Sequence, residues 1–508
     1  MKKLLIIGFT LAIVTSLASC EKGFLNVNTN PNSPTDVNSG VLVSNDLYQI
    51  ASDQSIGLSQ VLGMWMGHWS RSGNFIQDIA TETYAISPGY SYSETFWQDM
   101  YHTNLDLQTV IQKSKANKDP FFEGISMILQ AYQFEKLVDV YNDVPYTQAL
   151  DINNILPKYD DAATIYTDLF AKIDSGIAML KTAEGVEYSG TVSTDAPFDI
   201  MFQGSVSSWI QFANTLELKM LLNLSEDASD ASFIPGQIAK IEADSAGFLQ
   251  AGTSAMVNPG YINSTGKQSP FYSFFGFTPT GAATQNNAYF RANTYAVAFS
   301  TVTNDPRLNY FFNTTASVNT GADTVAGNYE GQPSANSNSN TSGFGPGLLG
   351  TAISSTPIIP DFESLFWQAE AALRGWIPGS AQTFYDGAIT QSMVYEGVPN
   401  PTAAAQAYLS QSISGVEWPS SISDQLATII KQEWCALNGI DELEVWNNYR
   451  RLDLPADIPL SQNANRTATT TPVRLLYPQT EIDRNGANVP AVGKNPGAQF
   501  TGNIFWMP

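Results

Sequence analysis

Histidine and cysteine are nearly absent from this sequence, which excludes several kinds of catalytic site. His68 and His102 are the only histidines and form no HExxH pair, so a zinc site built on histidines lacks ligands. A GxSxG motif, a P-loop and a GxGxxG motif that follows a predicted strand are also missing. Of the two cysteines, Cys435 lies in an apolar helical pattern and is expected to be buried. The sequence therefore predicts no catalytic residue, no metal site and no cofactor.

Long apolar runs are missing as well, apart from one at the amino terminus. Residues 4–17 follow Lys2 and Lys3, and the run is too short to span a bilayer, which takes about 20 apolar residues. A basic start, an apolar middle and small residues before a cleavage site are typical of a secretory signal peptide. Cys20 follows Ala18 and Ser19, which is typical of a lipoprotein signal, because the lipid is attached to that thiol. An ordinary signal peptide with a chance cysteine is the alternative.

Lipidation of Cys20 would decide the organisation of the chain. Several acyl chains give stable membrane anchoring, whereas one chain gives only marginal binding. With Cys20 triacylated, Cys435 has no partner for an intrachain disulfide. We predict a signal peptide over 1–19, an Asn-, Pro- and Ser-rich tether over 20–40, and a single domain over 41–508.

Basic residues are scarce. The chain has 24 of them against 47 acidic residues, and loss of Lys2 and Lys3 would leave a formal charge of −25. Such a surface repels nucleic acid and anionic lipid, so no nucleic-acid partner is expected. Aromatic residues, by contrast, make up 12% of the chain. A surface that stacks on sugars or peptides has this composition, and so does a large helical core, and composition leaves both open.

The apolar periodicity predicts a mainly α-helical fold. Apolar residues recur at spacings of three and four, which fits helices and not strands. Helices are expected over 120–141, 162–180, 362–376 and 422–437, and near 95–115, 205–223, 381–396 and 440–451. Several of them follow one another in pairs that mix alanine with bulky aromatics, as tetratricopeptide-like helical hairpins do.

Between the helices lie stretches without helical periodicity. Three of them, near 69–92, 253–290 and 314–358, are predicted as inserts; the latter two are rich in turn residues. Long irregular segments within a globular chain are usually functional or disordered.

Several segments resemble, in order along the chain, those of the SusD/RagB family, in its SusD-like second subgroup. They are Phe24–Asn32, Phe134–Tyr146, Trp209–Leu216, Gln368–Gly375, Glu433–Leu437, Glu444–Trp446, Arg450–Pro455 and Arg474–Glu481. Each match alone is weak, but together they span nearly the whole chain. Asn142 and Asp453 depart from the family pattern, because glycine is usual at both positions.

The resemblance implies both a fold and a function. It implies a scaffold of four tetratricopeptide-like units whose irregular inserts form the ligand face. It also implies an outer-membrane, outward-facing lipoprotein that binds an oligosaccharide and passes it to a TonB-dependent, SusC-like β-barrel transporter. Some members bind peptides instead, so both ligands stay open.

Ligand contacts are expected in the inserts, where exposed aromatic planes would pack on sugar rings and Asn or Ser would pair with hydroxyls. The candidates are Trp69, Ser72, Asn74, Tyr84, Tyr90, Tyr92, Phe271, Tyr272, Phe274 and Phe275. Within the family segments, polar residues such as Asn214, Glu370, Arg450 and Arg451 are instead expected to satisfy buried partners and lock helices together.

A surface glycosidase is the remaining alternative, since that chemistry needs only two carboxylates across a cleft. Asp441, Glu442 and Glu444 cluster in the sequence, but their place at the start of a predicted helix favours capping. We therefore predict a binding protein and not an enzyme.

Overall fold

Helices make up most of the chain. The computed structural model describes residues 37–75, 79–183, 191–193, 196–316, 323–324 and 341–508, so Cys20 and most of the predicted tether lie outside the described residues. The longer helices are α2 (Ser39–Ser55), α5 (Ser91–Asn117), α6 (Pro120–Tyr141), α7 (Ala162–Ala183), α8 (Val206–Asn223), α9 (Phe233–Asp244), α14 (Asp361–Leu373), α15 (Ala381–Tyr395), α17 (Ile422–Ala436) and α18 (Glu442–Leu452). Every helix predicted from periodicity is confirmed.

Shorter helices fill the connections. They are α3 (Ser59–Trp65), α4 (Ile79–Thr83), α10 (Gln285–Tyr289), α11 (Thr294–Val302), α12 (Leu308–Phe311), α13 (Pro346–Leu349), α16 (Pro401–Leu409) and α19 (Gln479–Asn485). Single 3-10 turns are η1 (Leu224–Glu226), η2 (Ala228–Ser232), η5 (Ala491–Lys494) and η6 (Pro496–Phe500), and η3 (Tyr272–Gly276) is a π-helical turn.

The long helices begin and end where local chemistry favours it. The side chain of Asp119 accepts a hydrogen bond from the backbone N–H of Phe122, 3.2 Å away, and Pro120 occupies the first helical position of α6. Ser421 caps α17 in the same way through Asp424 N at 3.2 Å. These caps satisfy backbone N–H groups that have no partner inside the helix.

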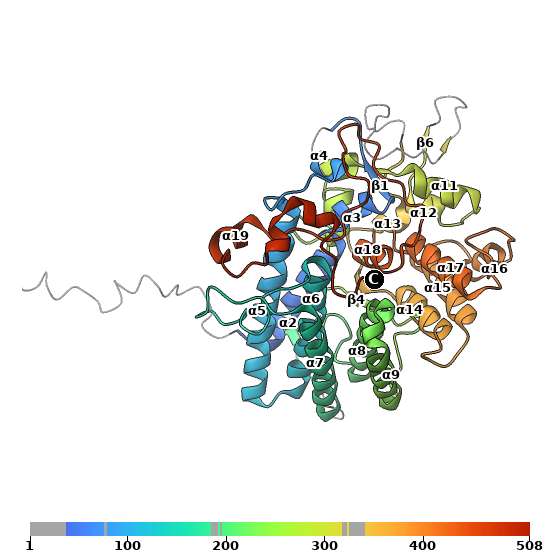
Figure 1. Cartoon of the computed structure of the whole chain (residues 1–508). Helices are drawn as coiled ribbons and strands as arrows, with labels where there is room; N and C mark the ends of the chain where they lie inside the picture. The colour runs from blue at the N-terminus through green and yellow to red at the C-terminus, as the bar shows by residue number, and fades with distance from the viewer. Residues whose placement is uncertain (1–36, 76–78, 184–190, 194–195, 317–322, 325–340) are drawn as a thin grey trace, which may run out of the picture. The chain divides into compact units, whose positions relative to one another are not determined.

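The helices pack as antiparallel neighbours. Helices α5, α6 and α7 lie side by side, as do α14 and α15 (Figure 1). At Gly124 a Cβ would stand only 2.8 Å from the carbonyl oxygen of Gly176, so these glycines let α6 and α7 approach closely. The mainly α, tetratricopeptide-like helical-pair fold is confirmed.

In the part of the chain that the structure describes, the β-strands form four two-stranded antiparallel sheets, and three isolated β-bridges lie outside them. The strands pair as β1 (Trp69–Arg71) with β5 (Phe290–Ala292), β2 (Thr191–Ser193) with β3 (Ala196–Pro197), β4 (Ala255–Val257) with β8 (Thr356–Ile359), and β6 (Thr315–Ala316) with β7 (Asp323–Thr324).

Two of these sheets join the three predicted inserts. In the β1–β5 sheet, Trp69 pairs with Ala292, which ties the insert near 69–92 to the end of the insert near 253–290. In the β4–β8 sheet, Ala255 pairs with Ile359, which ties the second insert to the end of the third. The sheets therefore tie the described parts of the inserts to one another; α4 and β1 lie in the upper part of Figure 1, and α13 and β4 nearer its centre.

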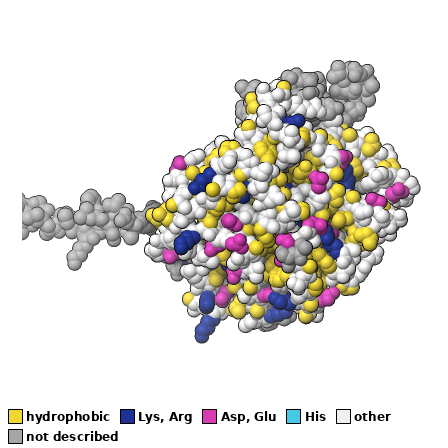
Figure 2. All heavy atoms as spheres, in the orientation of Figure 1, with side chains coloured by type: hydrophobic (Ala, Val, Ile, Leu, Met, Phe, Trp, Pro, Cys, Tyr) yellow, Lys and Arg dark blue, Asp and Glu magenta, His cyan; other side chains and the backbone are white. Residues whose placement is uncertain are grey.

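Acidic side chains are spread over the visible face of the molecule and do not gather in one patch (Figure 2). Within the described ranges, no helix combines the length and the apolar composition needed to cross a bilayer. Cys435 is buried, as the sequence predicted, with 3% of its surface exposed.

Candidate functional site

An aromatic cluster joins the two groups of predicted ligand residues. The ring centre of Trp69 lies 4.0 Å from that of Phe344. The ring centres of Phe275 and Phe271 lie 4.9 and 5.6 Å from that of Phe344. Trp69 and Phe275 are each only 3% exposed, and Phe271 is half-buried. This cluster therefore holds the inserts together, and its buried rings offer no open plane to a ligand in this conformation.

The predicted tyrosines lie apart from that cluster. Tyr84 is 1% exposed, packs against Trp65 at 6.1 Å and accepts a hydrogen bond from the backbone N–H of Ser461. Tyr90 is also buried and its ring lies 5.3 Å from that of Tyr92, which is half-exposed. Of the three, Tyr92 is the one whose ring reaches solvent.

The remaining predicted residues differ in exposure. Ser72 is buried and its backbone N–H donates to the carbonyl of Tyr289, whereas Asn74 is exposed. Tyr272 and Phe274, on the turn η3, are half-buried, as Phe271 is. Asn74, Tyr92, Phe271, Tyr272 and Phe274 are thus the members of the predicted set that are not buried, and ligand contact by any member of the set stays a prediction.

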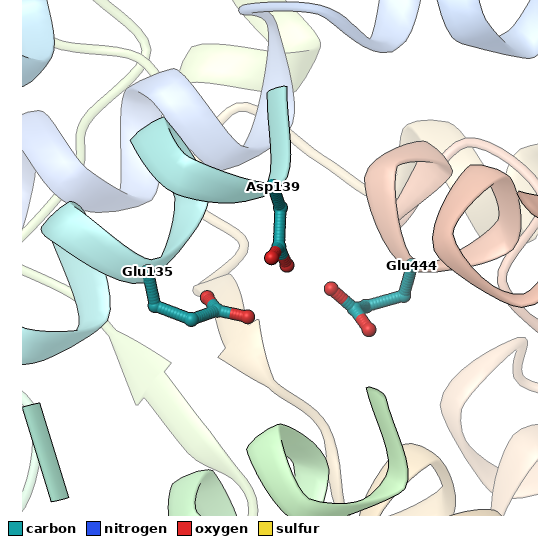
Figure 3. Close-up of side chains that lie close together, drawn as sticks. All are labelled: Glu135, Asp139 and Glu444. Atoms are coloured by element: carbon teal, nitrogen blue, oxygen red, sulfur yellow. The ribbon is translucent and has the colours of Figure 1, made fainter. Parts of the chain in front are cut away.

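Three buried carboxylates meet at the centre of the helical scaffold. Glu135 and Asp139 come from α6 and Glu444 from α18, and their carboxyl groups point toward one another (Figure 3). The ammonium of Lys219, from α8, lies between them, with Nζ 2.9 Å from Glu135 Oε1 and 2.6 Å from Glu444 Oε1. Lys219 therefore bridges two of the three carboxylates, those of Glu135 and Glu444.

Burial and charge both act on this cluster. Burial raises the pKa of Glu135 well above its usual range, and the neighbouring Asp139 raises it further. Burial also raises the pKa of Glu444 to about 7, although Lys219 opposes this shift. Burial lowers the pKa of Lys219, but Glu135 and Glu444 outweigh it and raise that pKa well above its usual range. The lysine is therefore held charged among the carboxyl groups.

Asp139 connects the cluster to the rest of the core. Its Oδ1 accepts from the hydroxyl of Tyr166 at 2.6 Å and from the indole N–H of Trp506 at 2.8 Å. Its Oδ2 accepts from Asn447 at 3.0 Å and from Asn223 at 3.1 Å. These hydrogen bonds join five segments that are distant in sequence. The cluster therefore stabilises the helical scaffold.

The polar residues of the family-like segments are structural, as the sequence predicted. The guanidinium of Arg451 donates to both carboxylate oxygens of Glu370, at 2.6 and 2.8 Å. Arg450 donates to the carbonyl of Asp139 at 2.6 Å, and Asn214 donates to the carbonyl of Gly247 at 2.9 Å. All of these side chains are buried.

The carboxylates considered for a glycosidase are buried too. Asp441 caps α18 by accepting from Glu444 N at 3.1 Å. Glu442 accepts from Gly439 N at 2.9 Å and its other oxygen lies 2.8 Å from His68 Nδ1. Exposure of all three residues is 4% or less, so they do not border a substrate cleft.

A larger hollow than these residues offer lies elsewhere. A groove of about 780 Å³, called the α11–α17 groove below, is lined by α11, the turn 414–419, the outer face of α17 and the loop 454–457. Its volume falls in the usual range of ligand sites, about 300–1,000 Å³. None of its residues was predicted as a site. The one sequence signal is a pair of aromatics, Tyr295 and Phe299, one helical turn apart on α11.

Two smaller hollows have volumes of about 300 and 290 Å³. The first borders Phe271 and Tyr395. The second lies beside Trp97 and includes Ile152 and Ile155, whose side chains are strongly exposed at 78% and 82%.

Comparison with known proteins gives a consistent result. The model of the SusD-like family described as starch-binding and associating with the outer membrane matches residues 31–478. No match is found among curated proteins. Among solved structures, a SusD-like protein from Bacteroides thetaiotaomicron is 21% identical with a TM-score of 0.72, and the match covers 92% of this chain and 98% of that one.

Two further structures agree. A chitin-binding SusD homologue from Flavobacterium johnsoniae is 20% identical with a TM-score of 0.71, covering 91% of this chain and all of that one. A SusD homologue from Bacteroides uniformis is 18% identical with a TM-score of 0.74, over 93% and 100% of the two chains. These likenesses establish the fold, and the family match extends over most of the sequence. The chain therefore belongs to the SusD-like family, whose members are described as starch-binding proteins associated with the outer membrane.

Proposed function

We propose that this protein is a lipoprotein anchored through Cys20 to the outer face of the outer membrane, where it binds an oligosaccharide and delivers it to a SusC-like, TonB-dependent transporter. The family match over residues 31–478 is the observation that carries the proposal. The lipoprotein signal and the chitin-binding relative from Flavobacterium johnsoniae support it. The protein acts by binding and leaves hydrolysis to other proteins.

Glycan, peptide and glycosidase functions are separated by one experiment. The detergent-solubilised full-length protein is applied to an array of oligosaccharides and peptides, and each ligand that binds is then incubated with it and recovered for mass analysis. We expect binding of at least one oligosaccharide and its recovery at full length. If only peptides bind, the ligand is a peptide and not a glycan. If the recovered oligosaccharides are shorter than those applied, the protein is a glycosidase.

The anchor has its own test. Replacing Cys20 with alanine is expected to move the protein from the membrane pellet to the soluble fraction, because stable anchoring requires the attached acyl chains. Cell fractionation followed by immunoblotting measures the distribution. Cys435→Ala is the matched control, since it removes the other cysteine, and it should stay in the pellet. A Cys20→Ala protein that also stays in the pellet, or a wild-type amino terminus without fatty acid by mass spectrometry, would contradict the anchor.

A further inference from the structure

Aromatic rings form one wall of the α11–α17 groove. Tyr295 and Phe299 are half-buried, and their rings lie 5.1 and 5.7 Å from that of Trp434, which supports them from the buried side of α17. Because Trp434 is 1% exposed, the two rings are held in place by the core while part of each faces the groove. Rings fixed in this way can pack on the apolar C–H face of a sugar without loss of side-chain freedom on binding.

Polar groups stand beside these rings. The hydroxyl of Tyr295 donates to Asp457 Oδ1 at 2.5 Å, and Lys431 Nζ lies 3.2 Å from the same oxygen. The ammonium also lies over both rings, 4.4 Å from the centre of Tyr295 and 4.8 Å from that of Phe299, and so covers part of their faces. The side chain of Asp457 nevertheless remains 72% exposed, so this positioned carboxylate is open to hydroxyl donors.

The charges in the groove select among ligands. Three carboxylates, of Glu417, Asp424 and Asp457, line it against the single ammonium of Lys431. Partial burial opposes ionisation of Asp457, but the hydrogen bond from Tyr295 and the charge of Lys431 outweigh it and lower the pKa of that carboxyl below its usual value. A ligand that carries carboxylate or sulfate groups would therefore meet net repulsion here.

We propose that the α11–α17 groove binds an uncharged oligosaccharide, with the parts of the Tyr295 and Phe299 rings that Lys431 leaves open as the apolar contact and Asp457 as the acceptor for sugar hydroxyls. This rests on the proposed function, because it assigns a place and a chemical class to the glycan. The groove adjoins the insert region, since Asn293, next to α11, donates its backbone N–H to the carbonyl of His68 and its side-chain amide to that of Trp69.

A blocking substitution tests the place. Ala298 is exposed on α11 and lines the groove, so Ala298→Arg should fill the groove without disturbing the core. Ala403→Arg is the matched control, because it makes the same change at an exposed position of another helix, α16. Isothermal titration of the full-length protein uses N-acetylchitohexaose and maltohexaose as uncharged probes and an oligogalacturonate of similar length as the anionic probe.

For whichever uncharged probe the wild type binds, we expect Ala298→Arg to weaken binding at least about tenfold and Ala403→Arg to leave it unchanged. Asp457→Asn, which keeps the shape of the side chain, is expected to weaken binding about tenfold, as the loss of a charged hydrogen-bond acceptor does. Thermal denaturation of each variant checks that it is folded. The oligogalacturonate should bind at least tenfold more weakly than the uncharged probe.

The outcomes distinguish this inference from the proposed function. If the wild type binds a probe and Ala298→Arg binds it equally well, the groove assignment is overturned while glycan binding stands. If the oligogalacturonate binds as tightly as the uncharged probe and Ala298→Arg abolishes it, the charge selection is wrong. If no uncharged probe binds and the array finds peptide ligands alone, the groove assignment and the proposed glycan function fail together.

Discussion

Replacing Lys219 with methionine is expected to lower the free energy of unfolding by about 3–5 kcal/mol, because it leaves buried carboxyl groups without their cation. Lys219 is 2% exposed and contacts Glu135 and Glu444, which are themselves buried. Methionine has nearly the same length, so the change removes the charge and little volume. Urea denaturation followed by circular dichroism measures the effect.

A second lysine provides the control. Lys240 pairs with Asp174 at 2.9 Å, but the two side chains are 55% and 36% exposed. Exposed ion pairs contribute about 0–1 kcal/mol, so Lys240→Met should cost no more than that. If Lys219→Met proves insoluble, the double variant Lys219→Met/Glu444→Gln, which also removes a carboxylate, should recover folded protein. Equal losses for Lys219→Met and Lys240→Met would contradict the structural role of the cluster.

Raising the pH from 6 to 9 is expected to lower the free energy of unfolding by at least about 2 kcal/mol. The cause lies between α2 and α5, where Asp46, which is buried, and Asp53, which is half-buried, face acidic residues of α5. Burial, and next Asp106, raise the pKa of Asp46 to about 8. Burial, and next Asp99, raise the pKa of Asp53 to about 7. Both carboxyl groups therefore become charged in this window.

The sign follows from proton binding. Each aspartate has a pKa near 4 in the unfolded chain and a higher one in the folded protein, so the folded state holds the proton more tightly. The resulting stability is complete below about pH 4 and is lost as the pH rises through 7 to 8. Glu370 behaves oppositely: burial opposes its ionisation, but Arg451 lowers its pKa, so its contribution changes only in acid, outside this window.

Substitution of Asp46 isolates one of these groups. Asp46→Asn should flatten the dependence of unfolding free energy on pH and should be more stable than the wild type at pH 9. Asp483→Asn, at an exposed position on α19, should leave the curve unchanged. Urea titrations at pH 6, 7.5 and 9 give the comparison. If the free energy of unfolding of the wild type is constant or rises over this range, the pKa values of Asp46 and Asp53 are not raised in the folded protein.

Much of the scaffold could be predicted from the sequence, because amphipathic helices carry their periodicity locally. The apolar spacing in 162–180 and 422–437 predicted α7 and α17 to within a few residues at each end. The assembly of the inserts could not be predicted in this way. Trp69 pairs with Ala292 across more than two hundred residues, and strands of three or four residues leave too short a pattern to read.

Amino-acid composition could not predict which aromatic residues contact a ligand. Aromatic content left open whether the rings stack on ligands or fill the core. For Trp69 and Tyr84, partners that hold them in the core, Phe344 and Ser461, come from distant parts of the chain. The α11–α17 groove is drawn from separate segments between residues 294 and 457. Apart from the spacing of Tyr295 and Phe299 on α11, no local pattern predicts this groove, because the chain brings its parts together only on folding.

The central claim is that the protein holds an intact oligosaccharide together with its transporter. The most direct measurement is to extract the wild-type protein from native outer membranes in mild detergent with a labelled oligosaccharide that binds it, and to separate the complexes by size. We predict that the label elutes at full length with both this protein and a large outer-membrane β-barrel. A protein that elutes alone, or a label recovered only as shorter products, would contradict the account.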